Sequence, residues 1–200
     1  MKVVFLDRDG VICHNRPDHV KNWDEFLFLE RSREAIARLT QAGLPVVIVT
    51  NQSAINRGLT TVEAVEQIHQ RMVAELEAHG GRVAGVYYCP HRPDEGCECR
   101  KPRPGLLLQA ARELGISLQD SYLVGDAVSD IQAAQAAGVP AYMVLTGRGQ
   151  QQYLESIRQG MGDFRPTLDL WQAVDSILRL ESPLPVHFER IVSQPGVLGP

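Results

Sequence analysis

The sequence predicts an α/β protein built on a doubly wound, mostly parallel β-sheet. Three features support this fold class: short apolar runs rich in β-branched residues recur along the chain, amphipathic stretches separate them, and polar residues follow where the runs end. Buried parallel strands are short and apolar throughout, and strands that alternate with helices form right-handed βαβ units. Ligands of such sheets bind beyond the carboxyl ends of the strands.

The predicted elements follow one another in a regular rhythm. Five segments have the composition of buried strands: Val3–Leu6, Pro45–Thr50, Val83–Tyr88, Tyr122–Gly125 and Ala141–Leu145. Four segments predict helices: Glu30–Ala42, Thr60–His79, Pro104–Leu114 and Ser129–Ala137. Residues that favour helix ends flank them, namely a TTVE capping box from Thr60, proline at one start, and glycine just past three ends.

Two regions interrupt this rhythm. Residues Ile12–Leu29 are polar and aromatic, and we expect them to form a lid or substrate loop. Residues Ser182–Pro200 hold four prolines and two glycines, which predicts an extended or partly disordered tail. We therefore expect one domain over residues 1–181 and a tail over 182–200. The short intervals between motifs leave no room for a large cap domain.

Composition excludes several classes of partner. The formal charge is −4 and the pI is about 5.9, so no basic surface for nucleic acid is expected. No apolar run approaches the roughly 20 residues that a membrane span needs, and the charged start MKVVFLDRDG is not a secretory signal. We expect a cytoplasmic monomer with a small-molecule substrate.

Chemically useful residues stand beside four of the predicted elements. Asp7 and Asp9 follow the first strand, and Thr50 and Asn51 end the second. Arg100 and Lys101 precede the helix that starts at Pro104, and Asp126 and Asp130 follow the fourth strand. Each group alone could be an ordinary turn or helix cap. Together they place acids, a hydroxyl and a lysine at one edge of the sheet. The acids would bind a divalent cation and attack phosphorus, while lysine would neutralise phosphoryl oxygens.

A cysteine and histidine cluster predicts a second metal site. Cys89, His91, Cys97 and Cys99 have the spacing C-x-H-x5-C-x-C within residues 89–99. Three thiolates and one imidazole complete the closed tetrahedral shell of a structural zinc ion. Such a site would fix the loop that carries Arg100 and Lys101. Cys13 is left over as a free thiol.

The motifs DRDG, TNQS, RKPRPG and GDAVSD resemble those of the haloacid-dehalogenase (HAD) superfamily of phosphatases, in order and spacing. With CPHRPDEGCEC, the chain is similar to its subfamily IIIA branch, which holds heptose-bisphosphate and histidinol phosphatases. The resemblance covers about residues 2–149. It implies a Rossmann-like HAD fold and a Mg²⁺-dependent phosphatase that acts on a sugar phosphomonoester in carbohydrate metabolism, as in lipopolysaccharide precursor biosynthesis.

The resemblance also implies roles for individual residues. Asp7 would be the nucleophile that forms an aspartyl phosphate, and Asp9 the general acid and base. The Asp7 carboxylate, the Asp9 carbonyl and Asp126 would hold Mg²⁺, while Thr50 and Lys101 stabilise the transferring group. Asp130 would orient Lys101 or Asp126. The expected substrate contacts are Asn51, Gln52, Ser53, Arg100, Arg57 and the Asn15–His19 stretch, including Asn15 and Asp18.

Substrate choice within the branch has opposing signals. NQSAINRGL, YYCPH and RKPRPG resemble the heptose enzymes, whereas the five-residue gap between His91 and Cys97 resembles histidinol phosphatases. Ala127 stands where both commonly have Lys or Arg after the fourth-motif aspartate. A polynucleotide 3′-phosphatase and a non-catalytic, zinc-stabilised interaction protein are the remaining alternatives. The acidic charge disfavours the former, and the retained acids and lysine disfavour the latter.

Overall fold

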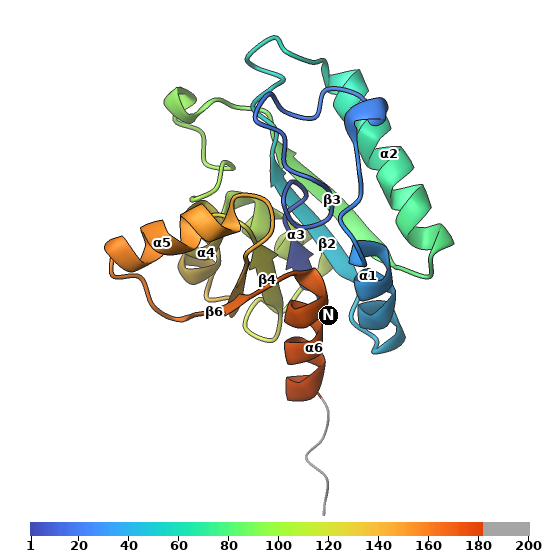
Figure 1. Ribbon diagram of the computed structural model, residues 1–200, viewed down its shortest axis with the longest axis vertical. Helices are drawn as coiled ribbons and strands as arrows, with labels where there is room; N and C mark the ends of the chain where they lie inside the picture. Colours follow the sequence, from blue (N-terminus) through green and yellow to red (C-terminus); the bar gives the residue numbers. More distant parts are fainter. Residues whose placement is uncertain (182–200) are drawn as a thin grey trace, which may run out of the picture.

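A computed structural model of the chain describes residues 1–181, and its centre is a six-stranded sheet in which all neighbouring strands are parallel (Figure 1). The strand order is β3-β2-β1-β4-β5-β6. The strands are β1 (Val4–Leu6), β2 (Val46–Asn51), β3 (Val83–Cys89), β4 (Tyr122–Gly125), β5 (Ala141–Val144) and β6 (Phe164–Thr167).

Helices cover both faces of this sheet (Figure 1). They are α1 (Ser32–Gln41), α2 (Val62–Ala78), α3 (Gly105–Leu114), α4 (Val128–Ala137), α5 (Gly149–Arg158) and α6 (Leu170–Glu181). Side chains alternate between the faces, as a period of two requires. Val4 and Leu6 pack with α1, α2 and α6, whereas Phe5 packs with α3 and α4 on the opposite side. The expected doubly wound α/β fold is confirmed.

The predicted strands and helices all form, with ends shifted by a few residues. The capping box at the start of α2 was misplaced by one residue, because the Thr61 hydroxyl, and not that of Thr60, accepts from the Ala64 amide at 3.2 Å. Elements after residue 145 were not predicted. Strand β6 lies at the sheet edge, where Arg165 and Pro166 are exposed and the other two residues are half-buried, so it lacks the continuous apolar run of a buried strand.

Residues 12–29 contain only one short 3₁₀ helix, η1 (Trp23–Glu25), and two isolated β-bridges. Stacked and edge-on rings of Trp23, Phe26 and Phe28 give this loop its own small aromatic cluster. No separate cap domain is present in the described part of the chain. The predicted tail at 182–200 lies outside the described residues, and within 1–181 no helix has the length and apolar character of a membrane span.

The strand order reverses direction at β1, which pairs with β2 on one side and β4 on the other. At such a reversal, the connections leave in opposite directions and open a crevice at the carboxyl ends of the strands. The residues that follow β1 and β4 therefore face a common opening. Helix α6 packs against α1, near the amino-terminal ends of the strands and away from this opening (Figure 1).

Helix α6 gives a test of the packing. Ile177 is fully buried in the core, whereas Leu180 is 52% exposed on the same helix. Truncation of Ile177 to Ala should lower the free energy of unfolding by about 2–5 kcal/mol, because it removes buried surface and leaves a cavity. Leu180→Ala should change it by less than about 0.5 kcal/mol. Urea denaturation of both variants measures this, and equal effects would contradict the packing.

Candidate active site

The centre of the site is a buried lysine between two carboxylates. Lys101 Nζ lies 3.0 Å from Asp7 Oδ1 and 2.5 Å from Asp130 Oδ1, and it donates to the Val49 carbonyl at 2.8 Å. All three charged side chains are nearly inaccessible to solvent. Burial disfavours an ammonium, but the two carboxylates more than offset it and raise the pKa of Lys101. The lysine is therefore a fixed positive charge at neutral pH.

Local structure places these groups together. Asp7 comes directly after β1, and its amide donates to Val124 of β4 at 3.0 Å. The backbone of Lys101 is clamped by the side chain of Asn51 at the end of β2. The Asn51 amide donates to the Lys101 carbonyl at 3.0 Å and accepts from its N–H at 3.1 Å. A loop residue is thereby held against the sheet edge.

Asp126, directly after β4, completes a carboxylate cluster. Oxygens of Asp7, Asp126 and Asp130 lie within 4.8 Å of one another, which suits a bound cation. Burial, together with the charges of Asp7 and Asp130, raises the pKa of Asp126 to about 7. The two oxygens of Asp130 already accept from Lys101 and from the Ala127 amide at 3.0 Å. Asp126 Oδ2 accepts from the Arg148 amide at 2.8 Å, whereas Asp126 Oδ1 has only a 3.5 Å contact with the Arg148 guanidinium and so has room for a cation.

Two glycines leave space for the Asp126 carboxylate. A Cβ atom at Gly10 would lie 2.2 Å from Asp126 Oδ2, and one at Gly147 would lie 2.4 Å from the same oxygen. Both glycines have positive φ values, +86° and +58°, which L-residues rarely adopt. Backbone from the β1 and β5 loops therefore closes around this carboxylate as no other residue type would allow.

Asp9 is held apart from the cluster by a hydrogen-bond network. Its carboxylate pairs with Arg8, and Oδ2 accepts from Gln52 Nε2 at 2.9 Å. Gln52 Nε2 also donates to the Thr50 hydroxyl at 2.9 Å. Although burial disfavours the carboxylate, the Arg8 charge and these hydrogen bonds hold the pKa of Asp9 below its usual value. The two acids of the DRDG turn consequently have different environments.

A cavity of about 440 Å³ opens above these groups. Most predicted site residues line it: Asp7, Asp9, Asn15, Thr50, Asn51, Ser53, Arg100, Lys101 and Asp130. Three predicted substrate contacts do not. Gln52 is buried beneath the cavity, with its amide occupied by Arg8, Asp9 and Thr50. Arg57 is exposed beside Ser53, and Asp18 is exposed and paired with Arg16 and Lys21.

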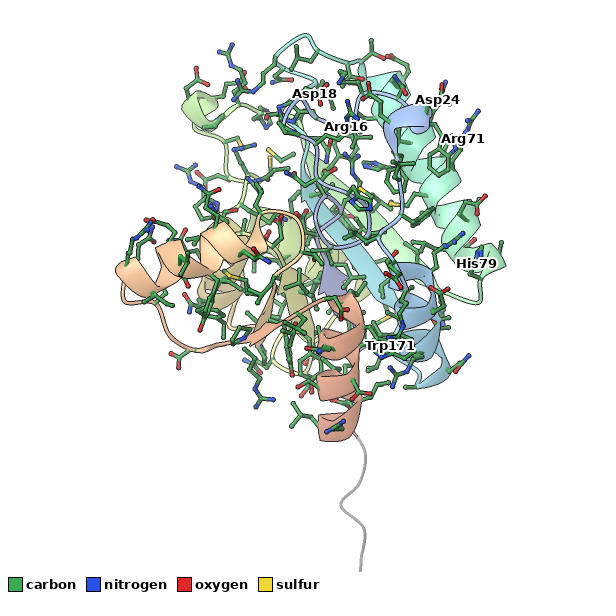
Figure 2. All side chains as sticks on the ribbon, in the orientation of Figure 1. Arg16, Asp18, Asp24, Arg71, His79 and Trp171 are labelled. Atoms are coloured by element: carbon green, nitrogen blue, oxygen red, sulfur yellow. The ribbon has the colours of Figure 1, made fainter. Side chains whose placement is uncertain are left out.

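Arg16 and His19, which belong to the predicted Asn15–His19 stretch, also line the cavity. Figure 2 shows Arg16 and Asp18 close together on the loop after β1. The structure adds Arg148, which the sequence did not single out and whose guanidinium lies 3.5 Å from Asp126. Arg148 belongs to the sequence TGRG after β5, where a basic residue at a strand end was the available signal. Arg8 is wholly buried, and no feature of the sequence signalled that.

The cysteine cluster has the geometry of a tetrahedral metal site. Cys89 Sγ and Cys99 Sγ each lie 3.4 Å from His91 Nδ1 and 3.6 Å from Cys97 Sγ. Ligands around zinc would be about 3.5 Å (S to N) and about 3.8 Å (S to S) apart, given the usual bond lengths. A disulfide would need about 2.05 Å. The donor set therefore fits a metal ion, and the four ligand atoms lie within 4.8 Å.

Comparison with known proteins identifies the class. The HAD-hydrolase-like family matches residues 98–169. A Pseudomonas aeruginosa protein is 44% identical over 147 residues, covering 74% of this chain and 83% of its own length. A Bordetella bronchiseptica protein is 44% identical over 151 residues, covering 76% and 84%. The chain belongs to the family of these relatives, which are phosphatases of the HAD superfamily.

Both relatives are named D-glycero-β-D-manno-heptose-1,7-bisphosphate 7-phosphatase. The structure agrees with this family. The B. bronchiseptica D,D-heptose 1,7-bisphosphate phosphatase, solved with magnesium and phosphate, has a TM-score of 0.85 at 40% identity, covering 90% of this chain and 99% of that one. The enzyme from Burkholderia thailandensis has a TM-score of 0.69 at 34% identity, covering 89% and 99%.

The raised pKa of Asp126 predicts how Mg²⁺ binding depends on pH. Without a cation this carboxyl titrates near pH 7, so below that pH a proton competes with the metal. Mg²⁺ affinity should be level above about pH 7.5 and fall roughly tenfold per pH unit below 6.5. Isothermal titration calorimetry between pH 5.5 and 8.5 measures this, with Asp24→Asn, at an exposed acid outside the cluster, as the control that should keep the same pH dependence. An affinity that does not change over this range would contradict the prediction.

Proposed function

We propose that the chain is a Mg²⁺-dependent phosphatase that removes the 7-phosphate of D-glycero-β-D-manno-heptose 1,7-bisphosphate through an aspartyl phosphate on Asp7. The observation that supports this most is the arrangement of Asp7, Lys101 and Asp126 at the carboxyl ends of the strands: Lys101 Nζ lies 3.0 Å from the Asp7 carboxylate, and oxygens of Asp7 and Asp126 lie within 4.8 Å of each other. The names of the relatives supply the substrate. We also infer that residues 1–181 are the catalytic domain.

In the first step, a carboxylate oxygen of Asp7 attacks phosphorus in line with the ester oxygen. The new bond joins Asp7 to phosphorus, the phosphorus–oxygen bond to the sugar breaks, and Asp9 donates a proton to the departing sugar oxygen. The Thr50 hydroxyl and the Lys101 ammonium interact with the phosphoryl oxygens as negative charge develops there. Lys101 cannot lose its proton at neutral pH, since the two flanking carboxylates hold it.

In the second step, Asp9 acts as a base. Its carboxylate takes a proton from a water molecule that attacks phosphorus, the bond between Asp7 and phosphorus breaks, and inorganic phosphate leaves. Asp7 is then a free carboxylate again, and Asp9 holds the proton that the next turnover needs. Because the pKa of Asp9 is lowered in the free protein, Asp9 loses this proton to solvent when no substrate is bound and takes one up again with the substrate.

Mg²⁺ would be held by the carboxylates of Asp7 and Asp126 and the backbone carbonyl of Asp9. The fit rests on oxygen ligands, which Mg²⁺ prefers, and on the mutual repulsion of buried acids that a cation relieves. When bound, the ion neutralises charge on the phosphoryl group. Asp130 stays with Lys101, which it contacts at 2.5 Å, and positions the ammonium.

Zinc would be held by Cys89, His91, Cys97 and Cys99, where it would have a structural role because no ligand position stays open. The loop it closes reaches the active site directly. Arg100 Nη1 donates to the His91 carbonyl at 3.0 Å, and Lys101 follows Cys99 by two residues. The ion would thereby fix the position of Arg100 at the wall of the cavity.

The cavity wall suits a substrate with a second phosphate. Arg16, Arg100 and Arg148 line it in addition to Lys101. Arg16 and Arg148 each pair with a carboxylate, whereas Arg100 donates to the His91 carbonyl and is the cation best placed for a second phosphate. Arg148 also provides a guanidinium beside Asp126, where Ala127 provides none. Guanidinium groups bind phosphate in a fork, with both charge and geometry matched. Histidinol phosphate, which has no second phosphate, would leave these guanidinium groups without an anionic partner.

Steady-state kinetics with Mg²⁺ test the substrate. We expect kcat/KM for heptose 1,7-bisphosphate to exceed that for histidinol phosphate by at least about tenfold, since each well-placed charge pair contributes on this scale. Asp7→Asn should remove turnover at unchanged thermal stability, whereas the same change at the exposed Asp24 should leave it intact. A preference for histidinol phosphate would overturn the substrate, and an active Asp7→Asn variant would overturn the nucleophile.

Elemental analysis of chelator-free protein tests the zinc site. We expect one zinc per chain, lost in Cys97→Ser because a hydroxyl is a much poorer ligand than a thiolate. The variant should be destabilised by several kcal/mol. Cys13→Ser, which changes a buried thiol outside the cluster, should retain the metal. Metal-free wild-type protein, or equal zinc content in both variants, would refute the assignment.

A further inference from the structure

The second residue of the DRDG turn is a charged side chain that the mechanism above does not use. Arg8 lies between the two catalytic acids in the sequence, yet its side chain is 0% exposed and turns into the protein. A buried guanidinium without partners would be costly, and a structural cation would normally pair with an acid of the core. Arg8 instead pairs with Asp9, which lines the cavity.

The pairing is multidentate and fixes the orientation of Asp9. Arg8 Nη2 lies 2.9 Å from Asp9 Oδ2 and 3.1 Å from Oδ1, and Nε lies 3.2 Å from Oδ2. Gln52 Nε2 adds a third donor to Oδ2 at 2.9 Å. Oδ1 has fewer partners, namely Arg8 and the weak donor Cys13 at 3.6 Å. Oδ1 therefore has fewer hydrogen-bond donors than Oδ2, so it is the oxygen that is easier to protonate.

The guanidinium is in turn held from behind. Arg8 Nη2 donates to Gln52 Oε1 at 2.9 Å, and Nη1 lies 3.2 Å from Nε2 of His69 on α2. His69 is buried and its ring lies 5.3 Å from that of Tyr88 on β3. Burial and the Arg8 charge lower the pKa of His69 to about 3, so the imidazole is neutral and its Nε2 accepts. The donors of Arg8 therefore have partners in the turn after β1, directly after β2 and on α2.

We propose that Arg8, Gln52 and His69 form a buried positioning unit whose function is to aim the Asp9 carboxyl at the leaving-group oxygen. This inference rests on the proposed function, because it requires Asp9 to act as the general acid. None of the three side chains lines the cavity. They act through Asp9, so their contribution depends on how much the leaving group needs a proton.

The dependence on the leaving group distinguishes a positioning role of these residues from a general role in stability. A sugar oxygen is a poor leaving group and needs the proton, whereas p-nitrophenolate leaves without one. The ratio kcat/KM reports the steps up to departure of the leaving group, before Asp9 acts as a base. Loss of correct aim should therefore lower kcat/KM for a sugar phosphate and spare that for p-nitrophenyl phosphate. General acid catalysis is worth roughly 10²–10⁴-fold, which bounds the effect.

The experiment compares Arg8→Lys with wild type on heptose bisphosphate and on p-nitrophenyl phosphate. We expect a loss of about 10²-fold on the sugar ester and less than about fivefold on the aryl ester. Arg71→Lys, at an exposed arginine of α2, should change neither. Figure 2 shows Arg71 on the outer side of that helix.

His69 provides an independent arm should Arg8→Lys fail to fold. His69→Leu removes the acceptor for Arg8 Nη1 and should lower kcat/KM for heptose bisphosphate by about tenfold. His69→Gln should recover most of this loss, because the Gln side chain again offers an acceptor. His79→Gln, on an exposed histidine, is the matched control. Equal losses on both esters, or none, would overturn the positioning role. A wild type inactive on both esters would instead overturn the proposed phosphatase.

Discussion

The site depends on one electrostatic constraint, the packing of several buried carboxylates around a single buried ammonium. Asp7 and Asp130 both contact Lys101, and Asp126 lies within 4.8 Å of the two acids. Three carboxylates and one ammonium leave an excess of negative charge among side chains that are almost completely buried. Such an excess is stable only if protons or a cation neutralise it. Without a metal ion, the raised pKa of Asp126 lets a proton neutralise part of this charge. In the active enzyme, a divalent ion would neutralise it instead.

The rest of the fold can be understood as holding this charge cluster in place. The strand reversal at β1 brings the residues after β1 and β4 to the same opening, and Asn51 fixes the loop that carries Lys101. Gly10 and Gly147 let backbone close around Asp126. The cysteine and histidine cluster lies one residue before Arg100, so a metal there would stabilise a loop with little core of its own. The contacts that hold these loops therefore also set the geometry of the site.

Much of this could be predicted from the sequence, for a physical reason. Parallel strands end at one edge of a sheet, so polar residues after Leu6, Thr50 and Gly125 had to meet, and metal-ligand spacing is local to residues 89–99. What escaped prediction depends on tertiary contacts. Arg8 sits in a turn of charged residues that would ordinarily face water, and only the fold shows that it points inward. Strand β6 lies at the edge of the sheet and is partly exposed, so its sequence shows no apolar pattern that would predict a strand.

The central claim is that Asp7 becomes phosphorylated. The most direct measurement uses Asp9→Asn protein with Mg²⁺ and p-nitrophenyl phosphate, whose leaving group needs no proton. Without the Asp9 base, hydrolysis of the intermediate slows, so acid quenching and peptide mass spectrometry should find one phosphoryl group on the peptide that contains Asp7. The aryl alcohol should be released in a burst of one equivalent. A peptide that stays unmodified while the ester is consumed, or a phosphoryl group on another residue, would contradict the account.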